Sequence, residues 1–394
     1  MEGEVAEVRH LQLAHPVDVR ALSDEDFRGR VASQARLGRT ASGRRTAFWQ
    51  TVGVGALDRS PGETERRVLE EEVVGFYDPR AKSLFVRAST GDQGQIVPRH
   101  PGTQSVLVHE IVHALQDQHF DLQYAQSLDE DEGLAYQALA EGDAILTSNG
   151  VGALEKGVFA QWRSRISDRT RALSPEAMLG KGGVWTEELR RAPALLRRRL
   201  LFPYVEGTAF VLELYRAGGF DLLDKAFARP PRSTEQVLHV QKYLAGEDPI
   251  PVDWPLPPVG WQVVVDGRMG ELQTGVVLAQ CVPSRDAEVA ASGWGGDAWA
   301  IVVDSDRQTA MLWGTVWDDE ASAIRFERAA KARALCTSAA PLFADVGRAV
   351  AVLRDGKRVA YVQGLPEPIR EVALHALLSL PFDPPPAQPP FGRN

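Results

Sequence analysis

The sequence predicts an α+β chain of two domains, an N-terminal one over residues 1–253 and a smaller C-terminal one over residues 261–380. Three observations support this expectation. A strongly apolar helix is expected at 104–120 and further helices follow it, whereas β-prone runs are short and few in the N-terminal domain. Five prolines lie between Asp248 and Pro258, which marks a linker, placed at 254–260. Beyond it, strand-like runs alternate with helical ones, as in a separate α+β unit.

The elements of the N-terminal domain follow from periodicity and from turn residues. Residues 16–22 alternate as a strand does, and Ser23 is suited to cap a helix that starts after it. Residues 72–88 predict a hairpin around Asp78-Pro79, which serves either as an edge for an extended peptide or as a purely structural hairpin. The helices expected are 104–120, about 131–150, an arginine-rich helical insertion at about 151–200, and 203–217, which ends at Gly218-Gly219.

The C-terminal domain shows a shorter alternation of elements. Its expected strands are 261–266, 299–303 and 310–316, its expected helices lie near 318–333 and 366–380, and 349–362 should form a hairpin. The proline-rich tail at 381–394 is expected to be disordered. Cys281 and Cys336 are too few for a disulfide framework, so they form either one disulfide or two buried thiols.

Composition excludes some classes of partner. The formal charge of −9 gives no electrostatic support for nucleic-acid binding, and the run Arg197 to Arg199 is interpreted as a solvated helix face. No segment has the apolar length of a membrane helix. The first eight residues are acidic and lack the apolar core of a signal peptide. The compartment is therefore left open between cytoplasm and export after a trimmed signal, and the oligomeric state is not predicted.

The expected helix at 104–120 carries the strongest chemical signal, the motif His109-Glu110-Ile111-Val112-His113. Two histidines four residues apart project from one helix face, so that both imidazoles can bind one zinc ion. Glu110 lies beside the first ligand, where it can act as general base on a zinc-bound water. The apolar neighbours of the motif are expected to bury this helix and keep the site rigid. The motif predicts a zinc-dependent hydrolase.

A catalytic zinc needs a third protein ligand, and two residues are candidates. His119 has the spacing of a metzincin ligand, but Gln116 stands where that pattern needs a glycine to break the helix. Glu141 lies on a separate expected helix, and Gly142 beside it permits close approach of another element. We therefore predict that His109, His113 and Glu141 bind zinc. Asp117 and Asp143 are each suited to orient a ligand histidine or to remain solvated, and the sequence does not decide between these roles.

The segments His109 to Gln116 and Leu139 to Ala144 resemble the thermolysin-like gluzincin peptidases, in which a distant Glu completes the zinc site. The resemblance implies a zincin-like metallopeptidase fold for residues 1–253. Pro203 to Gly207 is similar to a Pro-Tyr-x-x-Gly segment of the related aminopeptidases, which implies that Tyr204 donates its hydroxyl to the oxyanion. His239 is the alternative donor.

The chain also resembles, over most of its length, a group of uncharacterised bacterial and archaeal metallopeptidases, many of which are exported. The shared segments are Gly75 to Pro79, His109 to Leu122, Phe202 to Gly219, Ser233 to His239, Gly293 to Asp297, and Trp317-Asp318. The exopeptidase motif of the aminopeptidases is absent, and the interval from His113 to Glu141 is longer than in thermolysin-like enzymes. The leading prediction is thus a zinc endopeptidase with a peptide or protein substrate. The alternatives are a zinc hydrolase of other amides or esters, and a catalytically silent binding protein on the same scaffold.

Overall fold

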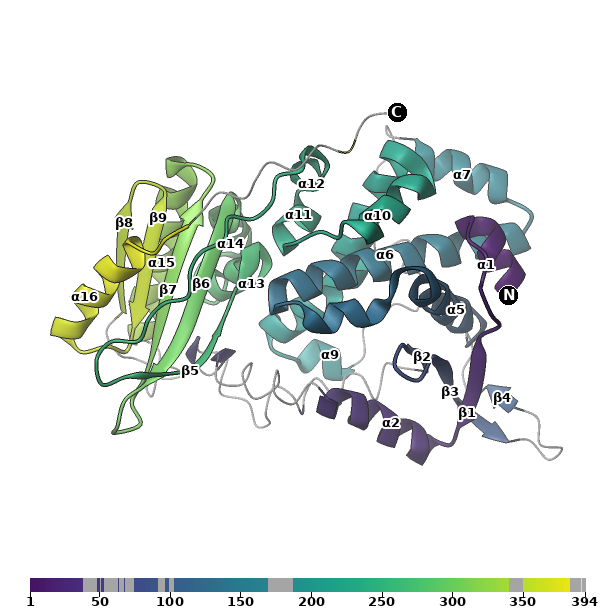
Figure 1. The fold of residues 1–394 in the computed structure, drawn as a ribbon, viewed down its shortest axis with the longest axis horizontal. Coiled ribbons are helices and arrows are strands. Elements are labelled where there is room, and N and C mark those ends of the chain that lie inside the picture. The colour runs from purple at the N-terminus through teal and green to yellow at the C-terminus, as the bar shows by residue number, and fades with distance from the viewer. Residues whose placement is uncertain are drawn as a thin grey trace.

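The computed structural model describes most of the chain. The residues described are 1–37, 48–49, 51–52, 63, 67, 74–90, 96–98, 103–168, 187–339, 350–382 and 391. The molecule is a mixed α+β structure in two parts, which confirms the predicted fold class at this level (Figure 1). A helical part with a small sheet lies beside a five-stranded sheet covered by helices on both faces. No helix among these residues has the length and apolarity needed to cross a membrane.

The first part holds the elements up to residue 245. They are α1 (Glu2–Arg9), β1 (Asp18–Leu22), α2 (Asp24–Leu37), β2 (Gly75–Asp78), β3 (Ser83–Thr90), β4 (Ile96–Pro98), α5 (Thr103–Phe120), the 3-10 helix η1 (Leu122–Ser127), α6 (Glu130–Glu155), α7 (Phe159–Ser167), α9 (Glu187–Arg191), α10 (Ala194–Ala228), α11 (Thr234–Leu238) and α12 (Val240–Ala245). The predicted hairpin is present as β2 and β3, and β1 joins it in parallel along the order β1-β3-β2.

Several boundaries differ from the sequence expectation. Helix α10 starts nine residues earlier than expected, and its regular path ends at Gly218 and Gly219, whose backbone angles are not helical. Helix α1 was not predicted, because its acidic sequence has a weak apolar pattern, yet Val5 and Val8 are fully buried. Residues 169–186, in the middle of the predicted helical insertion, lie outside the described residues.

Helices α5, α6 and α10 form the core of the first part, and each contributes several buried apolar side chains to it. The backbones of helices α6 and α10 come into contact at two glycines. A Cβ atom added to Gly142 would lie 2.3 Å from the carbonyl oxygen of Gly207, and one added to Gly207 would lie 2.3 Å from that of Ala138. Only glycine permits this backbone contact. The predicted close approach beside Glu141 is therefore present, with α10 as the partner.

The second part is built around an antiparallel sheet. Its elements are β5 (Gln262–Gly267), α13 (Gly270–Leu278), α14 (Ser284–Ala291), β6 (Trp294–Val303), β7 (Thr309–Trp317), α15 (Glu320–Ala339), β8 (Val350–Asp355), β9 (Arg358–Gln363) and α16 (Glu367–Leu378), with the strand order β5-β6-β7-β9-β8. Side chains alternate between two cores, with Trp299 and Ile301 facing α13 to α15, and Ala300 and Val302 facing α16. Helices α13 and α14 were not predicted.

The two parts share a buried junction. The carboxylate of Asp131 on α6 accepts hydrogen bonds from the backbone N–H and hydroxyl of Thr234, and that hydroxyl in turn accepts from the N–H of Leu272 on α13. The buried guanidinium of Arg333 on α15 donates to the carbonyl oxygen of Val52, 281 residues earlier. Phe48 also packs on Trp299, with ring centroids 4.5 Å apart. The expected linker at 254–260 therefore joins two parts that are also packed together.

Two further expectations are resolved in the C-terminal region. Cys281 and Cys336 form a disulfide, which ties the chain after α13 to α15. The tail was predicted to be disordered, but Phe382 forms a β-bridge with Val252, and Phe391 packs against Tyr243 with ring centroids 5.0 Å apart. The remaining tail residues, 383–390 and 392–394, lie outside the described residues.

Candidate metal centre

Three predicted ligand residues meet at the contact of α5 and α6. His109 and His113 lie one turn apart on α5, and their Nε2 atoms are 3.1 Å from each other. The Oε2 atom of Glu141 on α6 lies 3.0 Å from Nε2 of His109 and 3.4 Å from Nε2 of His113. Within the described residues these three form the group suited to hold a metal ion, with ligand atoms within 4.8 Å of one another. Each side chain keeps a small exposed fraction, so solvent reaches the group.

The hydrogen bonds around His113 fix which of its ring nitrogens faces the group. The amide nitrogen of Gln116 donates to the carbonyl oxygen of Ala140 and to Asp143, at 3.0 and 2.9 Å. Both partners are acceptors, so the amide oxygen of Gln116 must face Nδ1 of His113, 2.8 Å away. Nδ1 therefore donates to Gln116, and Nε2 is the ring nitrogen that faces Glu141. Two imidazole nitrogens and one carboxylate are a donor set of catalytic zinc sites.

The network behind the ligands continues to the N-terminal helix. Arg9 on α1 donates through Nε to both carboxylate oxygens of Asp143, at 2.9 and 3.1 Å, and through Nη2 to Asp224 on α10, at 2.7 Å. Arg9 is 1% exposed and Asp143 is fully buried. Asp143 thus acts on His113 through Gln116 rather than directly. Such indirect partners fix the tautomer and orientation of a metal ligand.

Asp117, the other aspartate suited to orient a ligand, has a different environment. It accepts hydrogen bonds from the hydroxyl of Tyr77 at 2.7 Å and from the ammonium of Lys82 at 2.8 Å. Both donors belong to the β2–β3 hairpin. Asp117 therefore fixes the hairpin against α5 and has no hydrogen bond with either histidine among the described residues.

Glu110 points from α5 toward the β2 strand. Its Oε2 atom accepts a hydrogen bond from the backbone N–H of Tyr77 at 2.7 Å, while Oε1 has no hydrogen bond to a described residue. Burial raises the pKa of Glu110, and the nearby His113 and His109 offset part of that increase. One oxygen is thus held in place by the backbone, and the other remains available to accept a proton.

Charge is balanced within the ligand group. Burial favours the neutral acid of Glu141, but His113 and His109 outweigh it and hold the pKa of Glu141 well below its usual range. Burial likewise disfavours the charged imidazole of His113, but Glu141 and Glu110 outweigh it and raise the pKa of His113 to about 9. Without a metal ion, a proton on the imidazole therefore compensates the buried carboxylate.

Tyr204 on α10 lies at the edge of the same group. Its hydroxyl is 3.4 Å from Oε1 of Glu141, which is a long hydrogen bond. The close contact of Gly142 with Gly207, one turn after Tyr204, sets this distance because it brings α6 and α10 together. The structure thus brings Tyr204 to the predicted ligands.

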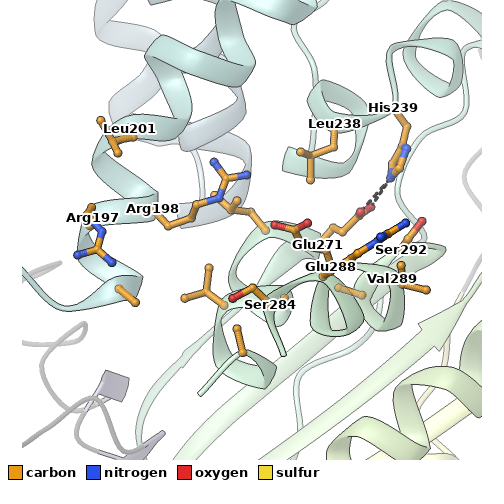
Figure 2. A pocket seen from close by; sticks show the side chains of 17 residues that line it. Arg197, Arg198, Leu201, Leu238, His239, Glu271, Ser284, Glu288, Val289 and Ser292 are labelled. Atoms are coloured by element: carbon orange, nitrogen blue, oxygen red, sulfur yellow. Dashed lines mark hydrogen bonds and ion pairs between the residues drawn. The ribbon is translucent and has the colours of Figure 1, made fainter. Parts of the chain in front are cut away.

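The two other candidate histidines lie elsewhere. Nε2 of His119 donates to the carbonyl oxygen of Gln12 at 2.8 Å, so His119 holds the segment after α1 and does not join the ligand group. His239, the alternative oxyanion donor, contacts Glu271 on α13 at 2.9 and 3.0 Å (Figure 2). Both residues line a separate cavity, and none of the three ligands lines it. The structure therefore brings Tyr204 to the predicted ligands, whereas His239 has no contact with them among the described residues.

Sequence reasoning missed Gln116 and Arg9 as parts of this site. Gln116 follows His113 by three residues, so it lies on a neighbouring position of the same helix, and that spacing was a usable signal. Arg9 is separated from Asp143 by 134 residues. No local pattern indicates such a contact, and a single arginine in a short acidic helix gives no hint of burial.

The comparisons with known proteins bear on the second part of the chain. A family model described as a domain of unknown function (DUF8575) matches residues 261–374, from the residue before β5 into α16. No curated protein and no solved structure matches the chain. The family match leaves the whole metal centre outside its range, and its description assigns no activity.

Proposed function

We propose that this chain is a zinc-dependent peptidase of the gluzincin type, with a zincin-like N-terminal part. The observation that most supports the proposal is the convergence of His109, His113 and Glu141 from two helices, with Glu110 beside them. Two histidines of one helix and a Glu from a later helix form the ligand arrangement of gluzincins. The same arrangement would be unnecessary for a purely structural helix contact, which apolar residues stabilise better.

Each residue has a distinct role in this proposal. When bound, zinc lowers the pKa of water to about 7 and polarises a carbonyl group. Glu110 accepts the proton of the attacking water at Oε1, while Tyr77 N–H keeps Oε2 in place. Tyr204 releases its long contact with Glu141 and donates its hydroxyl to the oxygen on which negative charge develops. Gln116 holds His113 in the tautomer that leaves Nε2 free.

A peptide substrate is supported by the position of β2. This strand ends the order β1-β3-β2, so one side of it has no strand partner among the described residues. Tyr77 of β2 also contacts the base, so a chain lying along this edge would pass next to Glu110. Extended peptides bind such edges through main-chain hydrogen bonds. An ester or a small amide would have no use for a strand edge.

The decisive experiment compares three proteins loaded with zinc: wild type, Glu110→Gln and Glu141→Ala. Cleavage of casein and of a mixed peptide library is measured with and without a chelator, together with zinc content after dialysis. We expect wild type to cleave peptides and lose activity with the chelator. Glu110→Gln should keep zinc and lose about 10²- to 10⁴-fold in rate, since only the base is removed. Glu141→Ala should lose zinc itself.

The outcomes separate the alternatives. Cleavage of simple esters or amides without any peptide cleavage would replace the peptidase with another zinc hydrolase. Stoichiometric zinc without hydrolysis of any of these substrates would favour the silent binding protein. Zinc retained by Glu141→Ala but lost by His119→Ala would remove the gluzincin assignment, and with it the role given to Tyr204.

A further inference from the structure

A cavity of about 640 Å³ lies between the two parts of the chain. One wall is the N-terminal half of α10, and the other is formed by α13 and α14, with the end of α11 closing the side (Figure 2). Its volume falls within the range of small-molecule sites, roughly 300–1,000 Å³. The metal ligands do not line it, although Tyr204 lies one turn beyond the cavity residue Leu201 on α10.

The interior of the cavity is aliphatic. Leu201, Leu238, Leu272, Val276 and Val289 line it, together with small residues of α13 and α14. Apart from His239, no aromatic ring is found among its described lining residues, so it has no platform on which a nucleobase would stack. Methyl and methylene groups facing one another favour a ligand whose body is an alkyl chain or an aliphatic side chain.

The polar groups of the lining carry an excess of positive charge in a chain whose formal charge is −9. Three guanidinium groups belong to it, those of Arg197, Arg198 and Arg285, against the carboxylates of Glu271 and Glu288. The carboxylate of Glu271 is already paired with His239, because both its oxygens lie within 3.0 Å of Nε2 of that imidazole.

The arginines differ in how they are held. Arg198 forms an ion pair with Glu206, which lies outside the cavity lining, and Arg197 donates to the carbonyl oxygens of Arg190 and Ala192. Arg285 is exposed and has no ion pair within the described part of the chain. Its guanidinium is therefore available to a carboxylate, with which arginine forms paired hydrogen bonds.

We propose that this cavity binds an amphipathic carboxylate, with its aliphatic body between α10 and α13 and its carboxylate at Arg285. Two sources share this chemistry, a free fatty acid and the C-terminal end of a short aliphatic peptide. The site needs neither a metal ion nor hydrolysis, so it stands or fails independently of the proposed peptidase activity. It also gives the second part of the chain, which contributes α13 and α14, a role in ligand binding.

Calorimetric titration of the full chain with decanoate, decanol and decyltrimethylammonium tests the chemistry. Decanoate should bind one to one. Decanol should bind about tenfold more weakly, because it lacks the charged partner of Arg285, and the cation should not bind. Shortening decanoate to hexanoate should weaken binding by up to about fourfold per methylene removed. Acetyl-dileucine represents the C-terminal end of an aliphatic peptide. Whichever of decanoate and acetyl-dileucine binds more tightly shows whether the ligand is a fatty acid or a peptide end.

Two exposed substitutions locate the site. Val289→Trp adds bulk at the cavity, and Arg285→Glu reverses the available charge, whereas Val372→Trp and Arg328→Glu make the same changes on exposed positions of α16 and α15 outside the lining. The first pair should lose decanoate binding by at least tenfold and the control pair should not. Equal binding of the three ten-carbon probes, binding unchanged in both cavity variants, or no saturable binding of either carboxylate would overturn the proposal.

Discussion

Replacing Gly142 by alanine tests whether the contact of α6 with α10 controls the metal centre. The new Cβ atom would lie 2.3 Å from the carbonyl oxygen and 2.6 Å from the carbonyl carbon of Gly207. Carbon atoms in contact prefer a separation of about 3.5–4.0 Å. Both contacts are backbone atoms, which no side-chain rotation can move. The two helices must therefore separate by about 1 Å at this point.

The expected size of the effect follows from two opposing terms. Alanine favours a helix over glycine by about 1 kcal/mol. Overpacking of a tight interior typically costs about 1–3 kcal/mol, and the backbone contact here belongs at the upper end. A net loss of about 1–2 kcal/mol of unfolding free energy is expected. Glu141 is the neighbouring residue, and ligand distances must hold within about 0.2 Å, so zinc affinity should fall at least tenfold.

Gly152→Ala is the matched control. Gly152 belongs to the same helix, and a Cβ atom there would meet nothing within 4 Å. This variant should gain about 0.5–1 kcal/mol and keep wild-type zinc affinity. Urea unfolding measures stability, and competition with a coloured chelator measures affinity. A Gly142→Ala protein as stable as Gly152→Ala, with unchanged zinc affinity, would refute the argument that glycine contact positions Glu141.

Three further predictions use other contacts. Gln116→Met should weaken zinc binding by about 10- to 100-fold through loss of the hydrogen bond to His113, whereas Gln118→Met should not; equal affinities in a competition titration would contradict the tautomer argument. Because the pKa of His113 in the metal-free protein is raised to about 9, zinc binding should release a proton below that pH, and affinity should rise with pH and level off above about pH 9; calorimetry in buffers of different ionisation enthalpy measures the release. A chain ending at Asp253 should be insoluble, since it lacks Leu272 and the partner helices of the junction; a soluble fragment that binds zinc would show that the first part folds alone.

The sequence predicted the ligands and the base of the candidate centre, but not the residues that hold them in position. His109, Glu110 and His113 were predicted from spacing on one helix, and Glu141 from the need for a third ligand beside a glycine. These are local patterns, which a single sequence carries. Arg9 was not predicted, because its partners Asp143 and Asp224 lie 134 and 215 residues away.

The division into domains was predicted from proline content, and the strand alternation beyond residue 261 led to the correct fold class. Composition does not reveal how much surface two parts share. The burial of Phe48 against Trp299 and the hydrogen bond from Arg333 to Val52 depend on which faces meet in space. Helix α13 was missed because it is buried on nearly all sides and so lacks a one-sided apolar stripe, and α14 because the stripe it buries consists only of alanines.

The long separation between Arg9 and its partners has a consequence for how the protein is made. A ribosome adds about 5–20 residues per second, and domains generally begin to fold while synthesis continues. Asp143 lies 134 residues after Arg9 and Asp224 lies 215 residues after it, so the second carboxylate is added about 10–40 s later. During that interval the nascent chain contains Arg9 but not yet Asp224, the second carboxylate that pairs with its guanidinium. The arrangement around His113 therefore reaches its final form only after α10 has been translated, when more than half of the 394 residues have been added.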